Sequence, residues 1–274
     1  MFGLSHAQFG GLVVGLICTI LILVGLQCAL RLAFDAPTEG FRSEGEDNGD
    51  DRVWLRPGID RRARTGTQCT LLDSKQDDKL PNVTIDIVDE SCEDGLPHTV
   101  GPNRIRMTQS VWNGDSREQI LAHERIHLFQ KRNQAAWRQF YTEKWGYTHF
   151  EREAPPDAPE GTADTVRSNP DTSDSAWVCW QNRFWFVPVY RNPANPKIKE
   201  TETRVWDNRL KAWTSLPPEW RAFFCEDHRC PNQLEHPHEI SAEIASDPQS
   251  WKTPASLYLS EFLTSQKVES LPGR

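Results

Sequence analysis

The sequence lacks a basic surplus and has too little glycine and proline for a fibrous or disordered chain. Of its 274 residues, 31 are Lys or Arg and 39 are Asp or Glu, which gives a formal net charge of −8. Proteins that bind phosphate backbones usually carry a basic surplus, so we expect no nucleic-acid partner. Sixteen glycines and nineteen prolines exclude a collagen-like chain. Seven cysteines are too few for a small disulfide scaffold.

Two common catalytic motifs are also missing. Neither a Gly-x-Ser-x-Gly elbow nor a phosphate-binding P-loop occurs in the chain. What the chain does have is a high aromatic content, with eleven tryptophans and twelve phenylalanines. These residues indicate a large aromatic core, so we expect most of the chain to fold as one acidic globular domain.

The start of the chain has no charged side chain before Arg31. Residues 9–30 are almost entirely apolar, and about 20 such residues are long enough to cross a hydrocarbon core of about 30 Å. We therefore predict a short tail at 1–8, one transmembrane helix at 9–30 and a single-pass membrane location. A removed signal peptide and a buried core helix are the alternatives. The side of the membrane stays open, because Arg31 and Arg42 favour one side and the glycosylation sequon at Asn82 the other.

Composition divides the rest of the chain into a linker and one domain. Residues 35–52 are acidic with small residues between the charges, and a basic run follows at 61–64, so we predict a disordered acidic/basic linker at 31–66, with the basic run as a solvated loop or a processing site. Residues 67–274 should form the domain. Its patterns predict strands at 82–88 and 103–111, a helix at 115–146 with an Asp115/Glu118 capping box, a surface loop at 154–175, a buried hairpin at 177–190 and a helix from Pro237.

One motif on the predicted long helix indicates a metal site. It reads His123-Glu124-Arg125-Ile126-His127. Histidines four residues apart lie on one face of a helix, so both imidazoles can reach one ion. A glutamate directly after the first histidine can take up and deliver protons at metal-bound water. The motif predicts Zn²⁺ held by His123 and His127 with Glu124 as the catalytic residue, and two ordinary surface or capping histidines are the alternative.

The third protein ligand of such a site must come from elsewhere in the chain. Gln130 and Asn133 stand where a metzincin would have Gly and His, which excludes that branch. Glu239 and Glu243 are four residues apart on the predicted last helix. Here the sequence resembles the gluzincins, zinc metallopeptidases that combine HExxH with a glutamate from a later helix. The string Glu239-Ile-Ser-Ala-Glu243 is similar to the ExxAE pattern of the lethal-factor and Pro-Pro endopeptidase branch.

The resemblance implies roles for the two glutamates. Glu239 would bind the zinc, and Glu243 would support the site and is our first choice for orienting the imidazoles. Other candidates for the third ligand remain open, namely Glu243, Glu151, His236 and His238. The donor that stabilises the oxyanion is open among Tyr190, Tyr258 and His238.

The resemblance also implies a fold and an activity. We expect a zincin-like α+β domain with a small sheet, an HExxH helix and a mostly helical C-terminal part, preceded by the transmembrane helix. The expected activity is zinc-dependent hydrolysis of peptide bonds, with a peptide or protein as substrate and Glu124 as general base. The strand at 103–111 would be the sheet edge that binds the peptide. The sequence gives no indication of an oligomeric state.

Two rival interpretations and the cysteines stay open. The chain could be a membrane-tethered interaction or structural protein with a vestigial or stabilising metal site, or a zinc hydrolase with a non-peptide substrate. Cys225 and Cys230 bracket His228, which permits half of a structural zinc site, a short-loop disulfide or two free thiols. Pairing is not determined for the five cysteines outside the apolar run, Cys69, Cys92, Cys179, Cys225 and Cys230.

Overall fold

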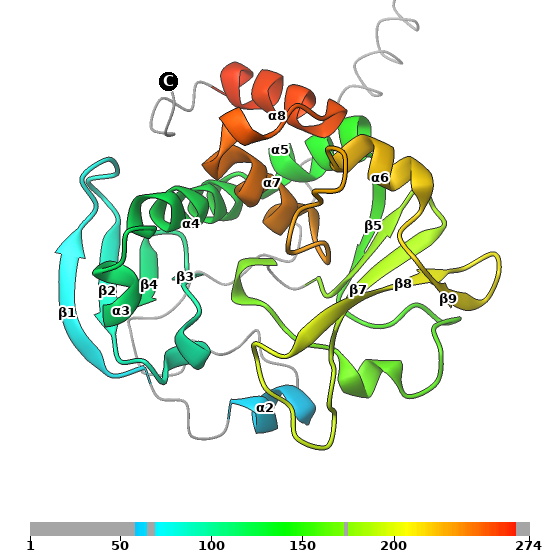
Figure 1. Cartoon of the computed structure of the whole chain (residues 1–274), viewed down its shortest axis with the longest axis horizontal. Coiled ribbons are helices and arrows are strands. Elements are labelled where there is room, and N and C mark those ends of the chain that lie inside the picture. Colours follow the sequence, from blue (N-terminus) through cyan, green and yellow to red (C-terminus); the bar gives the residue numbers. More distant parts are fainter. Residues whose placement is uncertain (1–57, 65–68, 173–174, 267–274) are drawn as a thin grey trace, which may run out of the picture. The chain divides into compact units, whose positions relative to one another are not determined.

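The computed structural model describes residues 58–64, 69–172 and 175–266, all within a compact unit from Asp50 to Arg274. These residues form two β-sheets and several helices, an α+β arrangement (Figure 1). The four-stranded sheet comes first in the chain, and the five-stranded sheet follows the long central helix. Only one small sheet was expected from the sequence.

The first sheet has the strand order β1-β2-β4-β3. Its strands are β1 (Leu71–Gln76), β2 (Thr84–Val88), β3 (His98–Val100) and β4 (Arg104–Thr108). β2 and β4 confirm the predicted strands at 82–88 and 103–111, although the second strand ends at Thr108 and continues as the short helix α3 (Gln109–Trp112). β4 pairs with β2 on one side and β3 on the other. The prediction that 103–111 is an edge strand open to substrate is therefore wrong.

The second sheet is an antiparallel meander in the order β5-β6-β7-β8-β9. Its strands are β5 (Tyr147–Glu151), β6 (Trp177–Trp180), β7 (Phe184–Tyr190), β8 (Thr201–Asp207) and β9 (Ala212–Thr214). β6 and β7 confirm the predicted buried hairpin, since every residue of both strands is buried. The turn residues Gln181 and Asn182 both have positive φ, as a tight hairpin turn between right-twisted strands requires.

The central helix is shorter than the predicted helix at 115–146. α4 spans Arg117–Arg132, and the chain bends at Asn133 before α5 (Gln134–Phe140) and a π-helical turn (Tyr141–Trp145). The segment ends at Gly146, whose φ of 79° gives the expected left-handed stop. The predicted capping box is wrong, because Ser116 is the N-cap residue and no side-chain cap bond forms.

The C-terminal part is mostly helical, with α6 (Pro218–Phe224), α7 (Pro237–Ser246) and α8 (Pro254–Ser265). The described residues also contain four short 3₁₀ helices, at Cys92–Gly95, Thr162–Thr165, Pro170–Thr172 and Pro248–Ser250. Helix α7 begins where the sequence predicted a helix, at Pro237.

Helix α4 is buried on two sides. Leu121 and Leu128 pack into a core with Ile85 and Met107 of the first sheet. Ile126 packs into a second, aromatic core that includes Ile240 of α7 and residues of the second sheet. Helices α4 and α7 therefore lie against each other, which brings together two motifs that are far apart in the sequence (Figure 1).

The structure corrects the prediction of a transmembrane helix and of a membrane location. Within the described ranges, no helix is both long and apolar enough to cross a bilayer. The longest described helix, α4, has 16 residues and carries charged side chains, whereas a span needs about 20 mainly apolar residues. Residues 1–8 and 9–30, to which the tail and the span were assigned, lie outside the described residues.

The end of the predicted linker belongs to the folded part. Residues 59–63 form the short helix α2 (Ile59–Ala63), in the stretch predicted as a disordered linker. Asp60 and Arg64 are buried, and the Tyr190 hydroxyl donates to Asp60 Oδ1 at 2.6 Å. Arg64 donates to the same Asp60 oxygen at 2.6 Å. The basic run at 61–64 is thus neither wholly solvated nor wholly in a loop.

Candidate metal centre

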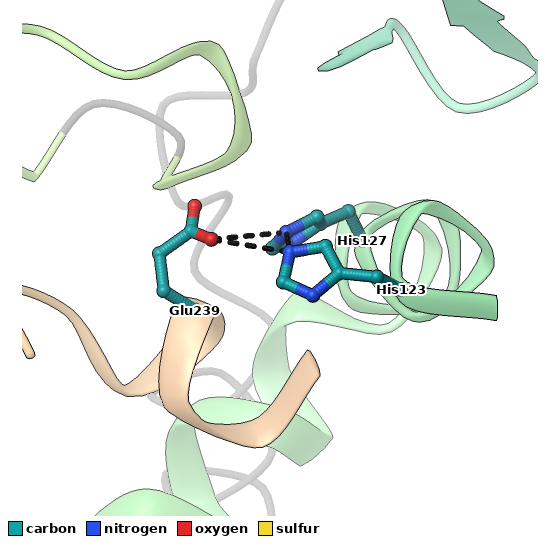
Figure 2. A group of neighbouring side chains, drawn as sticks. All are labelled: His123, His127 and Glu239. Atoms are coloured by element: carbon teal, nitrogen blue, oxygen red, sulfur yellow. Dashed lines mark hydrogen bonds and ion pairs between the residues drawn. The ribbon is translucent and has the colours of Figure 1, made fainter. Parts of the chain in front are cut away.

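Three predicted ligand side chains meet between α4 and α7. Figure 2 shows the imidazoles of His123 and His127 side by side on α4, facing the carboxylate of Glu239 on α7. The two Nε2 atoms are 3.0 Å apart. Oε2 of Glu239 lies 3.3 Å from Nε2 of His123 and 3.4 Å from Nε2 of His127. All three ligand atoms therefore converge on one point.

These separations fit a tetrahedral zinc ion. Zinc binds histidine nitrogen and carboxylate oxygen at about 2.0–2.1 Å, which places two ligand atoms of a tetrahedron about 3.3 Å apart. The three measured separations, 3.0, 3.3 and 3.4 Å, lie close to that value. In the part of the chain that the structure describes, no fourth His, Cys, Asp or Glu joins this ligand group. The donor set is thus that of a site with three protein ligands and one open position.

Local sequence explains why α7 presents Glu239. Pro237 takes the first helical position, where its missing N–H costs nothing. The ring of His236 caps the helix, because its Nδ1 accepts the backbone N–H of His238 at 3.0 Å. Ile240 and Ile244 bury the other face of the helix in the aromatic core. Glu239 is therefore held in the first turn, facing α4.

Gln130 orients His127, a role that the sequence analysis missed. Its amide oxygen lies 2.7 Å from Nδ1 of His127 and accepts that N–H, which leaves the Nε2 lone pair for a metal. Its amide nitrogen donates to the backbone carbonyl of His238 at 3.0 Å and to the Ser241 hydroxyl at 2.9 Å. Gln130 is fully buried. One side chain thus sets the tautomer of a ligand and joins α4 to α7.

Asn169 orients Glu239. Its amide nitrogen donates to Oε1 of Glu239 at 2.7 Å, so that Oε2 faces the imidazoles. Asn169 lies in the segment predicted as a surface loop at 154–175. That prediction is wrong for residues 166–172, because most of these residues are buried. Pro, Gly and Asp mark irregular backbone, but they do not tell a surface loop from one that packs into the interior.

Glu124 lies beside the ligand group and is buried. Its Oε2 has no hydrogen-bond partner among the described residues. Ligand atoms of Glu124, His127 and Asp171 lie within 4.8 Å of one another. Burial, and after it the carboxylate of Asp171, raises the pKa of Glu124 well above its usual range. A carboxylate in this position can exchange protons with a group bound at the open side of the site.

The site requires a positive charge. Burial alone would lower the pKa of His127. The carboxylates of Glu239 and Asp171 have the larger, opposite effect, so the pKa rises to about 10. Asp171 is partly balanced by Lys131, whose Nζ lies 3.3 Å away. Three buried carboxylates, those of Glu124, Asp171 and Glu239, therefore share this space. A divalent cation would supply the charge that they lack.

The remaining predicted site residues are not part of the ligand group. Glu243 accepts the backbone N–H of Asn232 at 2.7 Å and its side-chain amide at 3.1 Å. Gln130, and not Glu243, contacts the ring of His127. Glu151 is the exposed last residue of β5, where it pairs with Trp177 of β6. His236 and His238 are buried. The ring of His236 contacts the Ser175 hydroxyl and the backbone N–H of His238, and the ring of His238 contacts the Asp171 carbonyl.

None of the three candidates for oxyanion stabilisation lines the cavity beside the ligands. The hydroxyl of Tyr190 donates its hydrogen bond to Asp60. Tyr258 is 39% exposed and stacks near Phe223. The ring of His238 donates from Nδ1 to the Asp171 carbonyl at 3.2 Å. The geometry therefore assigns none of them this role.

The five cysteines of the described residues form two disulfides, Cys69–Cys92 and Cys225–Cys230, and Cys179 is free and buried. Cys225 and Cys230 are bonded to each other, so they are not available as half of a structural zinc site. Disulfides persist mainly in oxidising compartments.

Comparison of the chain with protein-family models, curated proteins and solved structures found no match. The resemblance to the gluzincins therefore depends on two short motifs and on the geometry around them. Membership of that family stays a prediction.

Proposed function

We propose that the chain is a zinc-dependent hydrolase of peptide bonds. The observation that supports this most directly is the convergence of His123, His127 and Glu239 beside a buried Glu124 whose Oε2 has no partner in the described residues. A stabilising zinc site usually has four protein ligands and is closed, whereas a catalytic site keeps one position open. Three protein ligands beside a buried carboxylate that is not itself a ligand favour catalysis.

The protein side chains have separate tasks in this proposal. When bound by the three ligands, zinc supplies a Lewis acid that activates water and polarises a carbonyl. Glu124 accepts the proton of the attacking water at its free carboxylate oxygen and returns it to the leaving amine. Gln130 and Asn169 hold His127 and Glu239 so that their lone pairs stay directed to one point.

A direct test uses Glu124→Gln. We expect the purified variant to keep wild-type zinc content and to lose peptide turnover by a factor of about 10² to 10⁴, because only proton transfer is removed. The matched control is Glu118→Gln on the same helix, whose side chain is 55% exposed and outside the ligand group. It should keep both zinc and turnover.

The rival role, a metal site that only stabilises the protein, gives a different result. Wild type and both variants would then bind zinc and none would cleave any peptide. A wild type that hydrolyses non-peptide amides or esters but no peptide would support another zinc hydrolase. Either outcome would contradict the proposed peptidase activity.

A further inference from the structure

The cavity beside the ligand group contains an arginine that the proposed mechanism does not use. The cavity has a volume of about 300 Å³ and is lined by His123, Glu124 and Glu239 together with Arg167. Ligand pockets in proteins begin at about this size. The Arg167 side chain contacts Glu235, which lies four residues before the ligand Glu239 in the chain. Any group bound at Arg167 would therefore lie close to the metal ligands.

Arg167 is buried without a full set of hydrogen bonds. It is 7% exposed, and its Nη2 lies 3.3 Å from Oε1 of Glu235. That contact uses one of the five N–H donors of a guanidinium. Its Nε has no partner among the described residues. Buried donors without partners are costly, so this side chain is suited to a ligand with acceptor oxygens.

The other arginine of the cavity makes four hydrogen bonds within the protein. Arg64 donates to Glu93 at 2.7 Å, to Asp60 at 2.6 Å, to the Tyr190 hydroxyl at 3.1 Å and to the Ser168 carbonyl at 3.0 Å. Two carboxylates balance its charge. Arg167 has only one carboxylate near it among the described residues, that of Glu235, at the longer distance of 3.3 Å. Arg167 is therefore the better candidate to meet a negative group that enters the cavity.

The backbone around Arg167 ties it to the reaction site. The Arg167 side chain contacts Glu235, and two residues later Asn169 contacts Glu239. These two contacts link the same pair of chain segments, so the segment that positions Arg167 also positions a metal ligand. The backbone N–H of Arg167 donates to the Pro188 carbonyl of β7 at 2.9 Å, which fixes the segment against the second sheet.

The edge of the first sheet does not offer the substrate a strand to pair with at this point. β3 is the edge strand beside the site, and Thr99 is its central residue. The backbone N–H of Thr99 donates to Asp171 Oδ1 at 2.9 Å, and its carbonyl accepts from Lys131 Nζ at 2.9 Å. Both groups are thus occupied within the protein. Recognition of a substrate then depends on its side chains or its terminus.

We infer that Arg167 binds a carboxylate of the substrate within about two residues of the cleaved bond. This inference rests on the proposed function and names its substrate class, peptides that carry a negative charge next to the reacting group. The carboxylate is that of an aspartate or glutamate side chain, or that of the peptide C-terminus. An arginine recognises both through paired N–H···O bonds.

The test compares peptides that differ by one charge. One series places Glu or Gln at each of the two positions on either side of the cleaved bond. A second pair carries a free C-terminal carboxylate or its amide next to that bond. We expect kcat/KM to be at least tenfold higher for the charged member of one pair, and the pair concerned identifies the source of the carboxylate. Arg167→Gln should reduce the ratio of kcat/KM between the charged and the uncharged member of that pair to about one.

Controls separate recognition from folding. Arg191→Gln removes an exposed arginine outside the cavity and should keep the preference. If Arg167→Gln does not fold, Arg167→Lys serves instead and should weaken the preference, since an ammonium cannot form the paired bonds. Equal kcat/KM for all charged and uncharged pairs in wild type, or equal slowing of both members by Arg167→Gln, would overturn the inference.

Binding without turnover distinguishes this inference from the proposed function. In the Glu124→Gln background, fluorescence titration should show that the charged peptide binds at least tenfold more tightly than its uncharged partner. Adding Arg167→Gln should abolish that difference. If wild type cleaves no peptide but this selective binding is found, the inference holds and the peptidase proposal fails. If peptides are cleaved without any charge preference, the peptidase proposal holds and the inference fails.

Discussion

Replacing Gln130 by methionine tests whether the orientation of His127 controls metal binding. Methionine has a similar length but neither accepts nor donates a strong hydrogen bond. Nδ1 of His127 would lose its acceptor at 2.7 Å. The His238 carbonyl and the Ser241 hydroxyl would keep each other as partners at 3.0 Å. The main loss is therefore the contact with the imidazole.

Two magnitudes follow from this change. Loss of an outer partner of a metal ligand typically lowers metal affinity by about 10- to 100-fold. A buried N–H left without an acceptor costs about 1–3 kcal/mol of unfolding free energy, even without metal. At a zinc concentration that is 100 times the wild-type Kd, zinc stabilises wild type by about 2.7 kcal/mol. A tenfold higher Kd would reduce that stabilisation to about 1.4 kcal/mol.

Competition with a chromophoric chelator measures the affinity, and urea denaturation with and without zinc measures the stability. The matched control is Gln139→Met, which changes an exposed glutamine whose amide contacts Glu143. It should leave zinc affinity unchanged. A Gln130→Met protein with zinc affinity within threefold of wild type would refute the argument that this hydrogen bond fixes the ligand.

Further predictions concern the disulfides and the metal-free protein. Replacing Cys69 and Cys92 by serine should lower the unfolding free energy by about 3 kcal/mol, and replacing Cys225 and Cys230 by about 2 kcal/mol, because the closed loops span 23 and 5 residues. Urea denaturation measures both, and the opposite order would contradict the loop argument. In a solution with a chelator the protein holds no metal, and the proton on His127 then contributes to the unfolding free energy. The pKa of about 10 predicts that this contribution is fully present below pH 6.5 and falls by up to about 1.4 kcal/mol per pH unit as the pH rises toward 10. The unfolding free energy of the zinc-loaded protein should not fall in this way, since the ion replaces the proton. Equal pH dependence of the metal-free and the zinc-loaded protein would be evidence against a cation at this point.

Local patterns predicted the parts of the site that a single helix determines. His123 and His127 lie on one face of α4 because helical spacing alone places them there. Glu239 is different, since only the tertiary packing of α7 on α4 brings it within 3.3 Å of His123. Its choice as a ligand came from the resemblance to a family motif. Nothing in residue spacing could select it over Glu243, which also lies in the ExxAE string.

The missed residues show what kind of signal was available. Gln130 is three residues after His127 on the same helix, and such pairs are neighbours. Helical spacing could therefore have identified it. Asn169 gave no such signal, because it comes from an irregular segment that contacts Glu239 only in the folded chain. The strand β8 does not alternate in exposure, since its first four residues are partly or fully exposed and its last three are buried, which explains why a strand was not predicted there.

The use of an amide at position 130 follows from the charge of the site. A carboxylate in contact with a metal-binding histidine raises the basicity of the ring. Here the space between α4 and α7 already holds the carboxylates of Glu124, Asp171 and Glu239. A fourth carboxylate would add to the charge that the cation must balance, and it could not donate to the His238 carbonyl, whose distance from the Gln130 nitrogen is 3.0 Å. The neutral amide orients the ring and also joins the two helices, so metal affinity and the packing of α7 on α4 depend on the same side chain.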